Sequence, residues 1–470
     1  MVEMTPAEIM KQIFDERVLM QRWLDVEVSL AKAEAKVGLI PAEAAIEISK
    51  HGKLELLDMA VFNETMQRVG HPIMAMIAAL QAVCKGDAGQ YIHWGVTSQD
   101  IIDTGNVLRL KDAFGVVYGS VRQIEDNLLN LAEKHADTIM VGRTHCNHAI
   151  PTTFGFKVVI WARQIRRDII RLQECQDRLL VGNITGAIGT MASFEGKGPQ
   201  VQELTLKELG LGVPDVCWHA ARDRSAEFAH ILAMIASAVG RIAGNIKLLM
   251  TTELDEVSEW REGQVGSSTM PQKHNPAISE VVVAEARKIR YLAAMVTEAI
   301  LVDHERDMNF WHAEINPLAE ILVEMGDLLT NGLYLTEGLT VFPEKMRENL
   351  DIQRGLVMSE RVMLEMGKKV GKQTAHEILF EDATRTFAEG LQFKKVLLDD
   401  SRVTEVMNES EIDFLLDPST YLGIAPQKTR ELVALSREER EKDRKITSGP
   451  GAGLKFRSEQ QAGASFLGEK

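Results

Sequence analysis

Residues 226–250 read AEFAHILAMIASAVGRIAGNIKLLM. Apolar side chains recur there at spacings of three and four residues, which predicts an α-helix. Alanine, leucine, methionine and valine fill most of the remaining circumference, and a helix that is apolar all round must be buried on every side. We predict that this helix lies in a core shared between the subunits of an oligomer; a large core within one chain is the alternative. The residues that define the spacing are Phe228, Ile231, Ile235, Ile242, Ile246 and Leu249.

The same stretch is not predicted to cross a membrane. His230, Arg241, Asn245 and Lys247 interrupt it, whereas a spanning helix needs about 18 uncharged apolar residues. The N-terminus lacks the apolar core of a signal peptide. The four cysteines are widely scattered and contain no CxxC pair, which favours free thiols in a reducing compartment. We therefore expect a cytoplasmic protein.

The rest of the chain predicts more long helices. Proline cannot continue a helix interior, and residues 73–150, 152–198, 215–270 and 277–316 contain none. Apolar residues recur at helical spacing in these gaps as well, and alternation with a period of two is rare. The fold class predicted from this pattern is all-α, with a long central bundle. A second helical series comprises Val117, Val121, Ile124, Leu128 and Leu131.

Composition excludes several classes of protein. Of the 470 residues, 45% are hydrophobic and 26% are charged, which is ordinary for a soluble globular protein and excludes a disordered or fibrous chain. The formal net charge is -15 and no long basic run is present, which argues against nucleic acid or an anionic membrane as a partner. An anionic ligand must therefore be bound by local positive groups.

Residues 266–276, GSSTMPQKHNP, are the most distinctive string in the sequence. Backbone N–H groups, hydroxyls, a lysine and an asparagine can together bind a carboxylate and stabilise the charge that develops when a neighbouring C–H proton is removed. A solvated surface loop is the plain alternative. Two further segments carry similar groups: HWGVTSQD at 93–100, where Thr97 or Ser98 can equally cap a helix, and RTHCNH at 143–148.

Together these three segments resemble the shared motifs of the fumarase/aspartase superfamily, in its adenylosuccinate lyase and carboxymuconate cycloisomerase branch. The resemblance spans residues from about 10 to 450 and keeps the family's order. It implies a helical homotetramer whose long helices pool into one bundle, with each active site built from three subunits. With the helix pattern it predicts an N-terminal helical domain at 1–112, the central bundle at 113–355, a C-terminal helical domain at 356–441 and a flexible tail at 442–470.

The resemblance also implies a chemistry, the anti elimination of an amine or hydroxyl from a succinyl group with release of fumarate and without a metal or organic cofactor. Ser267 matches the base, and His145 matches the acid that protonates the leaving group. Because a serine hydroxyl is a weak acid, the site must supply donors and positive charge that favour its alkoxide. The residues expected to bind the substrate are Thr97, Ser98, Thr144, Lys273, Asn275, His93, His71 and Met270.

The branch is read from segments outside the loop. The Arg-Tyr pair and the phosphate-binding residues of adenylosuccinate lyases are missing, with Ile315 in place of an arginine, which argues against a nucleotide. WHAE at 311–314 and WH at 218–219 look more like the cycloisomerase branch, but His145 stands where bacterial cycloisomerases carry tryptophan. We predict a C–N lyase that releases fumarate from an N-succinyl substrate. The alternatives are a carboxymuconate cycloisomerase, then an adenylosuccinate lyase or an inactive structural relative.

Overall fold

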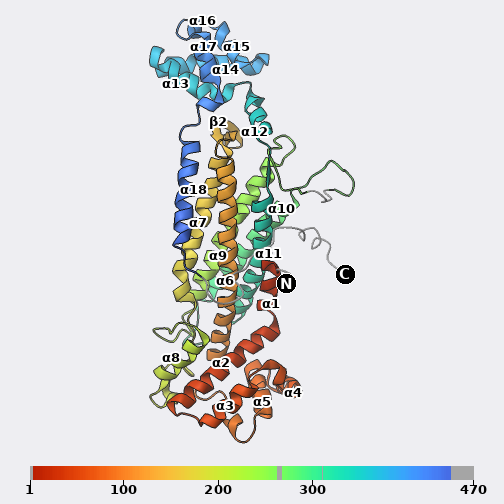
Figure 1. The fold of residues 1–470 in the computed structure, drawn as a ribbon, viewed down its shortest axis with the longest axis vertical. Helices are drawn as coiled ribbons and strands as arrows, with labels where there is room; N and C mark the ends of the chain where they lie inside the picture. Colours follow the sequence, from red (N-terminus) through yellow and green to blue (C-terminus); the bar gives the residue numbers. More distant parts are fainter. Residues whose placement is uncertain (1–3, 262–266, 310, 446–470) are drawn as a thin grey trace.

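The computed structural model describes residues 4–261, 267–309 and 311–445. They form an elongated, nearly all-helical molecule whose long helices run along its longest axis (Figure 1). We call the end of the bundle where α6 begins the lower end, and the end where α6 finishes the upper end, as drawn in Figure 1. The predicted all-α class with a long central bundle is confirmed.

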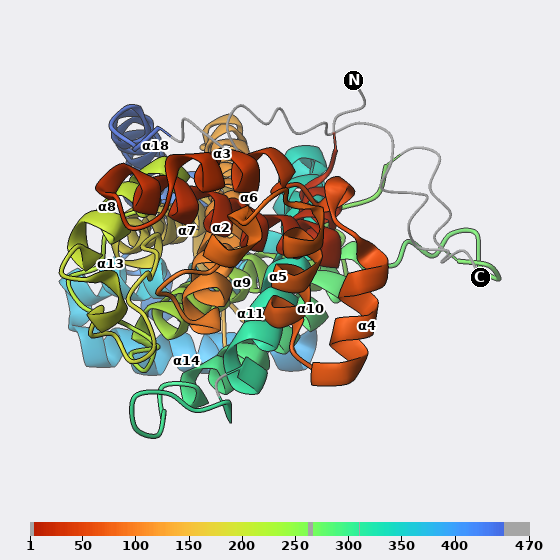
Figure 2. The ribbon, with the colours of Figure 1, turned by 90° about the horizontal axis from the view of Figure 1, so that it is seen from below.

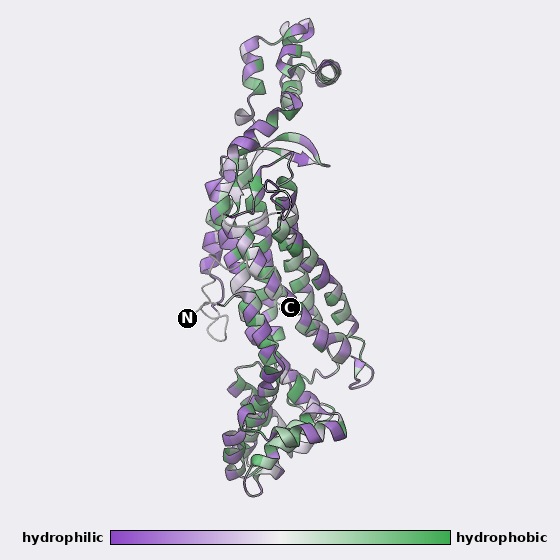
Figure 3. Ribbon diagram, turned by 90° about the vertical axis from the view of Figure 1, so that its right-hand side faces the viewer, coloured by the Kyte–Doolittle hydropathy of each residue, from purple (hydrophilic) through white to green (hydrophobic). Residues whose placement is uncertain are grey.

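Successive helices of the central bundle run in opposite directions, and their apolar sides meet in one continuous core. Hydrophobic residues follow these helices along most of their length (Figure 3). All six residues that define the helical spacing in 226–250 are buried, and each such side chain stabilises the fold by roughly 1.5–3 kcal/mol. The bundle helices are α6 (Ser98–Lys134), α7 (Phe154–Leu179), α9 (Asp223–Leu249), α10 (Ala277–Glu298) and α11 (Asn316–Gly338).

Helix α9 is long and apolar enough to span a membrane by length and composition, and it is the one such helix among the described residues. However, 56% of its most apolar window is buried inside the protein. It packs against α7, α10 and α11. The apolar character of α9 is therefore accounted for largely by its contacts within the bundle.

Smaller helices cover the lower end of the bundle (Figure 2). Their core also takes in side chains from the segment between α7 and α9, such as Phe194 and Trp218. The lower-end elements are α2 (Glu16–Val37), α3 (Ala42–His51), α4 (Met59–Val69), α5 (Pro72–Val83) and α8 (Gly198–Leu209), with short 3-10 turns at Leu54–Leu56, Ala88–Tyr91 and Ala192–Phe194.

At the upper end the chain forms an antiparallel hairpin of β1 (Ile139–Thr144) and β2 (Asn147–Thr153), which carries the RTHCNH segment. The sequence does not show the alternation of apolar and polar residues that is typical of strands, because a bulge interrupts the pairing between Val141 and Arg143. Pro151 is tolerated because each strand of a two-stranded ribbon has a free edge. Nearby lie β3 (Val257–Ser258), which pairs with β4 (Thr340–Val341), and α12 (Pro343–Asn349).

The C-terminal helices pack around a separate small core beyond the upper end. They are preceded by 3-10 turns at Leu350–Gln353 and Leu356–Met358, and a third 3-10 turn, Pro418–Thr420, follows them. A π-helix, Trp311–Ile315, precedes α11 at the lower end. The C-terminal helices are α13 (Ser359–Val370), α14 (Lys372–Glu389), α15 (Phe393–Asp399), α16 (Ser401–Thr404) and α17 (Glu409–Leu416).

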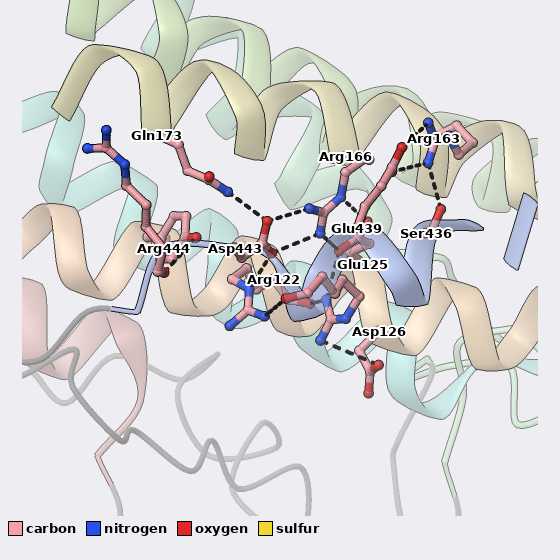
Figure 4. A network of polar contacts seen from close by, with 12 residues as sticks. Arg122, Glu125, Asp126, Arg163, Arg166, Gln173, Ser436, Glu439, Asp443 and Arg444 are labelled. Carbon is pink, nitrogen blue, oxygen red and sulfur yellow. Dashed lines mark hydrogen bonds and ion pairs between the residues drawn. The ribbon is translucent and has the colours of Figure 1, made fainter. Parts of the chain in front are cut away.

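The last helix, α18 (Ala425–Glu441), returns along the bundle and is held there by ion pairs (Figure 4). Arg166, 1% exposed, donates to Glu125 at 2.7 Å and to Asp443 at 2.7 Å. Arg440 also donates to Glu125, at 2.7 Å. The partners lie on α6, α7 and the end of the chain, so this network fixes α18 to the bundle.

The predicted domain limits stay a prediction, but the packing crosses them. Helix α1 (Pro6–Ile13) contributes to the bundle core, and so does Val433 of α18. Of the predicted tail, Asp443 and Arg444 are bound to the bundle, and residues 446–470 lie outside the described residues.

Candidate active site

Thr97 and Ser98 mark the start of α6 at the lower end. Thr97 is its N-cap residue, as the plain alternative expected, and Ser98 is its first residue. The Oγ1 of Thr97 also accepts a hydrogen bond from Arg306 Nη1 at 3.2 Å. A helix N-terminus with free N–H groups, two hydroxyls and a guanidinium can bind a carboxylate. Sequence reasoning did not identify Arg306, which lies some 200 positions further along the chain.

His93 lies just before this helix start and is held in a left-handed backbone conformation with φ 62°. Its Nδ1 is 2.6 Å from Oε1 of the buried Glu27. Burial lowers the pKa of His93, but Glu27 outweighs that effect and the net pKa is raised. His71 precedes α5, and its Nδ1 is buried without a partner in the described part of the chain. Both histidines are therefore at the lower end.

Asp100, in the first turn of α6, organises this end. Its carboxylate accepts the backbone N–H of Thr97 at 3.1 Å, Thr185 at 3.0 Å and Gly186 at 2.9 Å, and His219 Nε2 lies 3.0 Å away. Asp100 is fully buried. It thereby fixes the start of α6 against the segment between α7 and α9. From its place in the sequence alone, Asp100 is no more than an acid in the first turn of a helix, where it favours the helix dipole.

Next to it lies a buried cluster of ion pairs centred on Arg222. Its guanidinium donates to Glu314 at 2.6 Å and to Asp103 at 3.0 and 3.1 Å. Burial opposes the charge on Arg222, but the two carboxylates raise its pKa. Glu314 of the WHAE segment and Arg222, which follows the WH pair at 218–219, thus meet in one structural unit. Ile315, which replaces the family's phosphate-binding arginine, packs against the apolar lower core.

His145 and Thr144 lie at the opposite end, at the tip of the β1–β2 hairpin, and both are exposed. His145 and Cys146 form the two-residue turn with φ values of 52° and 63°. Two-residue hairpin turns require positive φ, and side chains other than glycine and asparagine adopt it only at a cost. Such strain is typical of positions where a side chain has to be presented for function.

Buried carboxylates anchor the hairpin and the signature loop to the bundle. Arg143 of β1 pairs with Glu256 through two bonds of 2.6 and 2.9 Å. Glu259 accepts the N–H groups of Ile278 at 2.8 Å and Ser279 at 3.1 Å, so it caps the start of α10. Glu256 and Glu259 lie three residues apart on either side of β3. Both elements are therefore held at the upper end.

Ser267 is half-buried at the start of the described part of the signature loop. Its Oγ accepts the backbone N–H of Met270 at 3.0 Å and that of Thr269 at 3.3 Å. Hydrogen bonds donated to an oxygen stabilise its anionic form. Two donors therefore point at the atom that must carry negative charge if Ser267 is the base. Gly266, the loop's first residue, lies outside the described residues.

The remaining loop residues lie close by in the sequence and at the same end. Lys273 and Met270 are exposed, and Asn275 is half-buried just before α10. The ring of His274 stacks on Trp260, with centroids 3.9 Å apart and planes 7° apart. This stack joins the two ends of the loop.

The structure thus separates the predicted site residues into two groups. His71, His93, Thr97 and Ser98 are at the lower end, and the loop and hairpin residues are at the upper end. Helix α6 has 37 residues, so at 1.5 Å per residue the two ends lie about 55 Å apart. One chain therefore does not bring the predicted site together.

Comparison with known proteins identifies the family of this chain. A family described as lyase matches residues 3–290, and one described as adenylosuccinate lyase C-terminus matches residues 355–432. The N-acetyl-S-(2-succino)cysteine lyase of Dickeya dadantii is 42% identical over 90% of this chain and 93% of its own. The adenylosuccinate lyase of Methanocaldococcus jannaschii is 38% identical over the same shares.

A solved structure is similar in both fold and sequence. The 3-carboxy-cis,cis-muconate lactonizing enzyme of Pseudomonas putida has a TM-score of 0.85 and 35% identity, over 91% of this chain and 97% of that one. The predicted lyase and its family are confirmed by these matches. This chain belongs to the lyase family of the fumarase/aspartase superfamily.

Proposed function

We propose that this lyase releases fumarate from a 2-substituted succinate whose leaving group is the amine or the thiol of a small amino-acid derivative. The observation that carries the proposal is the pair of backbone N–H donors on Ser267 Oγ. They favour the alkoxide that removes the proton from C3 of the succinyl group. Lys273, in the same loop, supplies positive charge for the resulting aci-carboxylate, and neither step calls for a metal or an organic cofactor.

The proposed acid is His145. Its exposed position at the hairpin tip lets it project into a site formed with other chains, where it donates a proton to the departing nitrogen or sulfur. An amine needs this proton more than a thiol, because a thiolate is a far better leaving group at neutral pH. The name of the Dickeya relative places the succinyl group on sulfur, and that of the adenylosuccinate lyase refers to a succinylated nucleotide.

A nucleotide is the less suitable leaving group. The position expected to bind phosphate is occupied by Ile315, which packs into the apolar lower core. A phosphate dianion at such a position lacks a charged partner and loses its hydration. We therefore favour a compact amino-acid derivative.

We further propose that the site forms in a homotetramer, with residues from several chains. Thr97 and Ser98 bind the succinyl carboxylates from the lower end of one chain, with His93 and His71 beside them, while Ser267, His145, Thr144, Met270 and Asn275 come from the upper ends of others. Neighbouring helices of the bundle leave large hydrophobic side chains exposed, which supports burial between chains. They include Ile160, Ile170, Met234, Leu248, Tyr291 and Met295. We place this soluble enzyme in the cytoplasm, where its four cysteines stay free.

The second candidate is carboxymuconate lactonisation, favoured by the likeness to the Pseudomonas putida enzyme. His145 argues against it, because closing a lactone ring releases no group that needs a proton. In both reactions Ser267 and the loop handle the proton next to a carboxylate. The two candidates therefore differ in substrate rather than in the catalytic base.

The test uses two matched substrates, N-acetyl-S-(2-succino)cysteine and an N-(2-succino) amino acid of similar size. Each is incubated with the purified enzyme, and fumarate is measured by chromatography, with the Ser267→Ala variant as the control. Release of fumarate from either supports the proposal, and the ratio of kcat/KM identifies the leaving atom. No release from either, together with consumption of 3-carboxymuconate, contradicts it in favour of the cycloisomerase.

A further inference from the structure

Cys217 lies in the segment that joins α8 to α9, close to the buried carboxylate of Asp100. Its side chain is half-buried, so solvent reaches it. The sulfur accepts a hydrogen bond from Thr185 Oγ1 at 3.2 Å, and Asn183 Nδ2 is 4.0 Å away. None of these groups belongs to the elimination machinery proposed above.

An imidazole stands beside this thiol. His219 is 1% exposed, and its Nε2 lies 3.0 Å from Asp100 Oδ1. The ring stands two residues from Cys217 in the sequence and acts on its side chain, and its buried Nδ1 has no hydrogen-bond partner within the described part of the chain. Asp100 is fixed in turn by backbone N–H groups. A thiol, an imidazole and a carboxylate thus stand in the order that activates a nucleophile.

The charges around the sulfur are consistent with this order. Burial raises the pKa of Cys217, but the neighbouring His219 and Thr185 outweigh it and lower the pKa overall. Burial lowers the pKa of His219, whereas Asp100 and Cys217 raise it to about 9. The two other charged side chains on the segment have their own partners: Asp215 is 3.6 Å from Arg224, and Arg222 is bound to Asp103 and Glu314.

Among the residues that the structure describes, the other cysteines have no such arrangement of partners. Cys175 is buried, and burial raises its pKa to about 12. Burial also raises the pKa of Cys84, to about 11, with Glu47 adding to the effect. Cys146 is exposed at the hairpin tip of a single chain and serves as a reference whose labelling the variants of His219 and Thr185 should leave unchanged.

We propose that Cys217, His219 and Asp100 form a reactive thiol site that takes electron-poor alkenes of the fumarate class and becomes S-alkylated. The thiolate adds to one alkene carbon and forms a C–S bond, while the π electron pair moves to the other carbon. His219 returns the proton of the thiol to that carbon, so atoms and electrons balance without an oxidant. The product is an S-(2-succino)cysteine side chain when the alkene is fumarate. Naming fumarate rests on the proposed function; the reactivity of the thiol does not.

The experiment labels the full-length protein with dimethyl fumarate, a neutral probe that needs no turnover. Adduct formation at each cysteine is followed over time by digestion and mass spectrometry, for the native protein and for His219→Gln and Thr185→Val. We expect Cys217 to be labelled in the native protein while buried Cys175 is not. His219→Gln lowers the rate at Cys217 at least tenfold at pH 7 and leaves Cys146 unchanged, and Thr185→Val lowers it by a smaller factor. Fumarate itself then gives the corresponding adduct at Cys217, more slowly.

The pH profile adds a second readout. The rate at Cys217 in the native protein has its midpoint below the ordinary thiol value of about 8.5, and His219→Gln moves that midpoint upward. Labelling of buried Cys175 shows that a variant has unfolded. If His219→Gln unfolds, the rate at Cys217 in Thr185→Val decides whether the proposal holds. Equal rates at Cys217 in native and variant proteins, or no labelling of Cys217 in the native protein, overturn the proposal. An active lyase with an inert Cys217 refutes the thiol site alone, and a reactive Cys217 in a chain that releases no fumarate refutes the proposed function alone.

Discussion

At the scale of single residues, Ser267 has to act as a base although a free serine hydroxyl holds its proton far too tightly. The two backbone N–H donors on its Oγ compensate for part of this difference, because they bind the alkoxide more strongly than the hydroxyl. The neighbouring Ser268 is exposed, and no such pair of donors to its oxygen is described. Two adjacent serines in one loop therefore provide a matched comparison.

We expect Ser267→Ala to lower kcat by at least about 10²–10³-fold, with KM changed much less, because the proton transfer is lost while the binding groups remain. Ser268→Ala should retain kcat within about threefold. Steady-state kinetics of fumarate release measures both, and light scattering checks that both variants keep the native mass. Comparable activity of the native enzyme and Ser267→Ala would show that another group is the base.

Glu34 on α2 is a second residue whose chemistry the sequence does not announce. It is fully buried, neither of its carboxylate oxygens has a partner in the described chain, and burial, with Glu27 nearby, raises its pKa to about 9. Its folded-state pKa lies above its ordinary value. The folded protein therefore favours the protonated carboxyl of Glu34. Its contribution to the free energy of unfolding is complete below about pH 4.5 and is lost as the pH rises through about 9.

Glu34→Gln should consequently raise the free energy of unfolding by up to about 3 kcal/mol at pH 7 and by little at pH 4.5, because the amide is neutral at every pH. Glu377→Gln on the exposed surface of α14 is the matched control and should change stability at neither pH. Urea unfolding at the two pH values gives the comparison. A pH-independent effect of Glu34→Gln would mean that packing, not ionisation, is responsible.

At the scale of elements, the hairpin that carries His145 is held at its base and strained at its tip. Arg143 and Glu256 fix the base, whereas His145 and Cys146 adopt left-handed conformations in the turn. Glycine is the preferred residue at the second turn position because it adopts positive φ without strain. The strained turn thus lowers the local stability of the hairpin while it positions the proposed acid, His145.

Cys146→Gly should therefore stabilise the closed hairpin by about 0.5–1 kcal/mol and slow amide hydrogen exchange in β1 and β2. Cys146→Ala, which keeps the steric restriction, should leave the exchange rates unchanged. Hydrogen exchange read by mass spectrometry on residues 139–153 distinguishes the two. Identical exchange in both variants would show that the turn is not strained.

The sequence predicts an element well when neighbouring residues determine it, and poorly when residues far apart in the sequence do. The spacing of apolar residues predicts α9, because its buried face places an apolar side chain at every third or fourth position along the helix. The hairpin escapes prediction, since the bulge after Val141 and Pro151 in β2 break the period of two. The cluster of Arg222, Asp103 and Glu314 escapes it too, because its members lie about 90 or more positions apart and a single sequence records no pairing between them.

At the scale of the whole molecule, the length of α6 decides what one chain can do. It holds Thr97 and Ser98 about 55 Å from the hairpin and the signature loop, so these groups can meet only if different chains lie side by side in opposite directions. The exposed hydrophobic side chains on α7, α9 and α10 lie on the helices that such an arrangement would cover. In such an arrangement the active site exists only in the assembled oligomer.

This arrangement predicts rescue between two inactive variants. Ser98→Ala removes a group from the lower end, and Ser267→Ala removes one from the upper end, so each homo-oligomer should lose most of its activity. When the two chains are co-expressed in equal amounts and mix at random, about a quarter of the sites receive an intact Ser98 from one chain and an intact Ser267 from another. We therefore expect roughly 25% of the native kcat from the mixed population.

Ser267→Ala mixed with His145→Gln supplies a comparison for two residues at the same end. Activity that stays at the level of the separate variants would mean that both serines serve one site within a single chain, and the fold described here would then have to bend far more than a 37-residue helix allows.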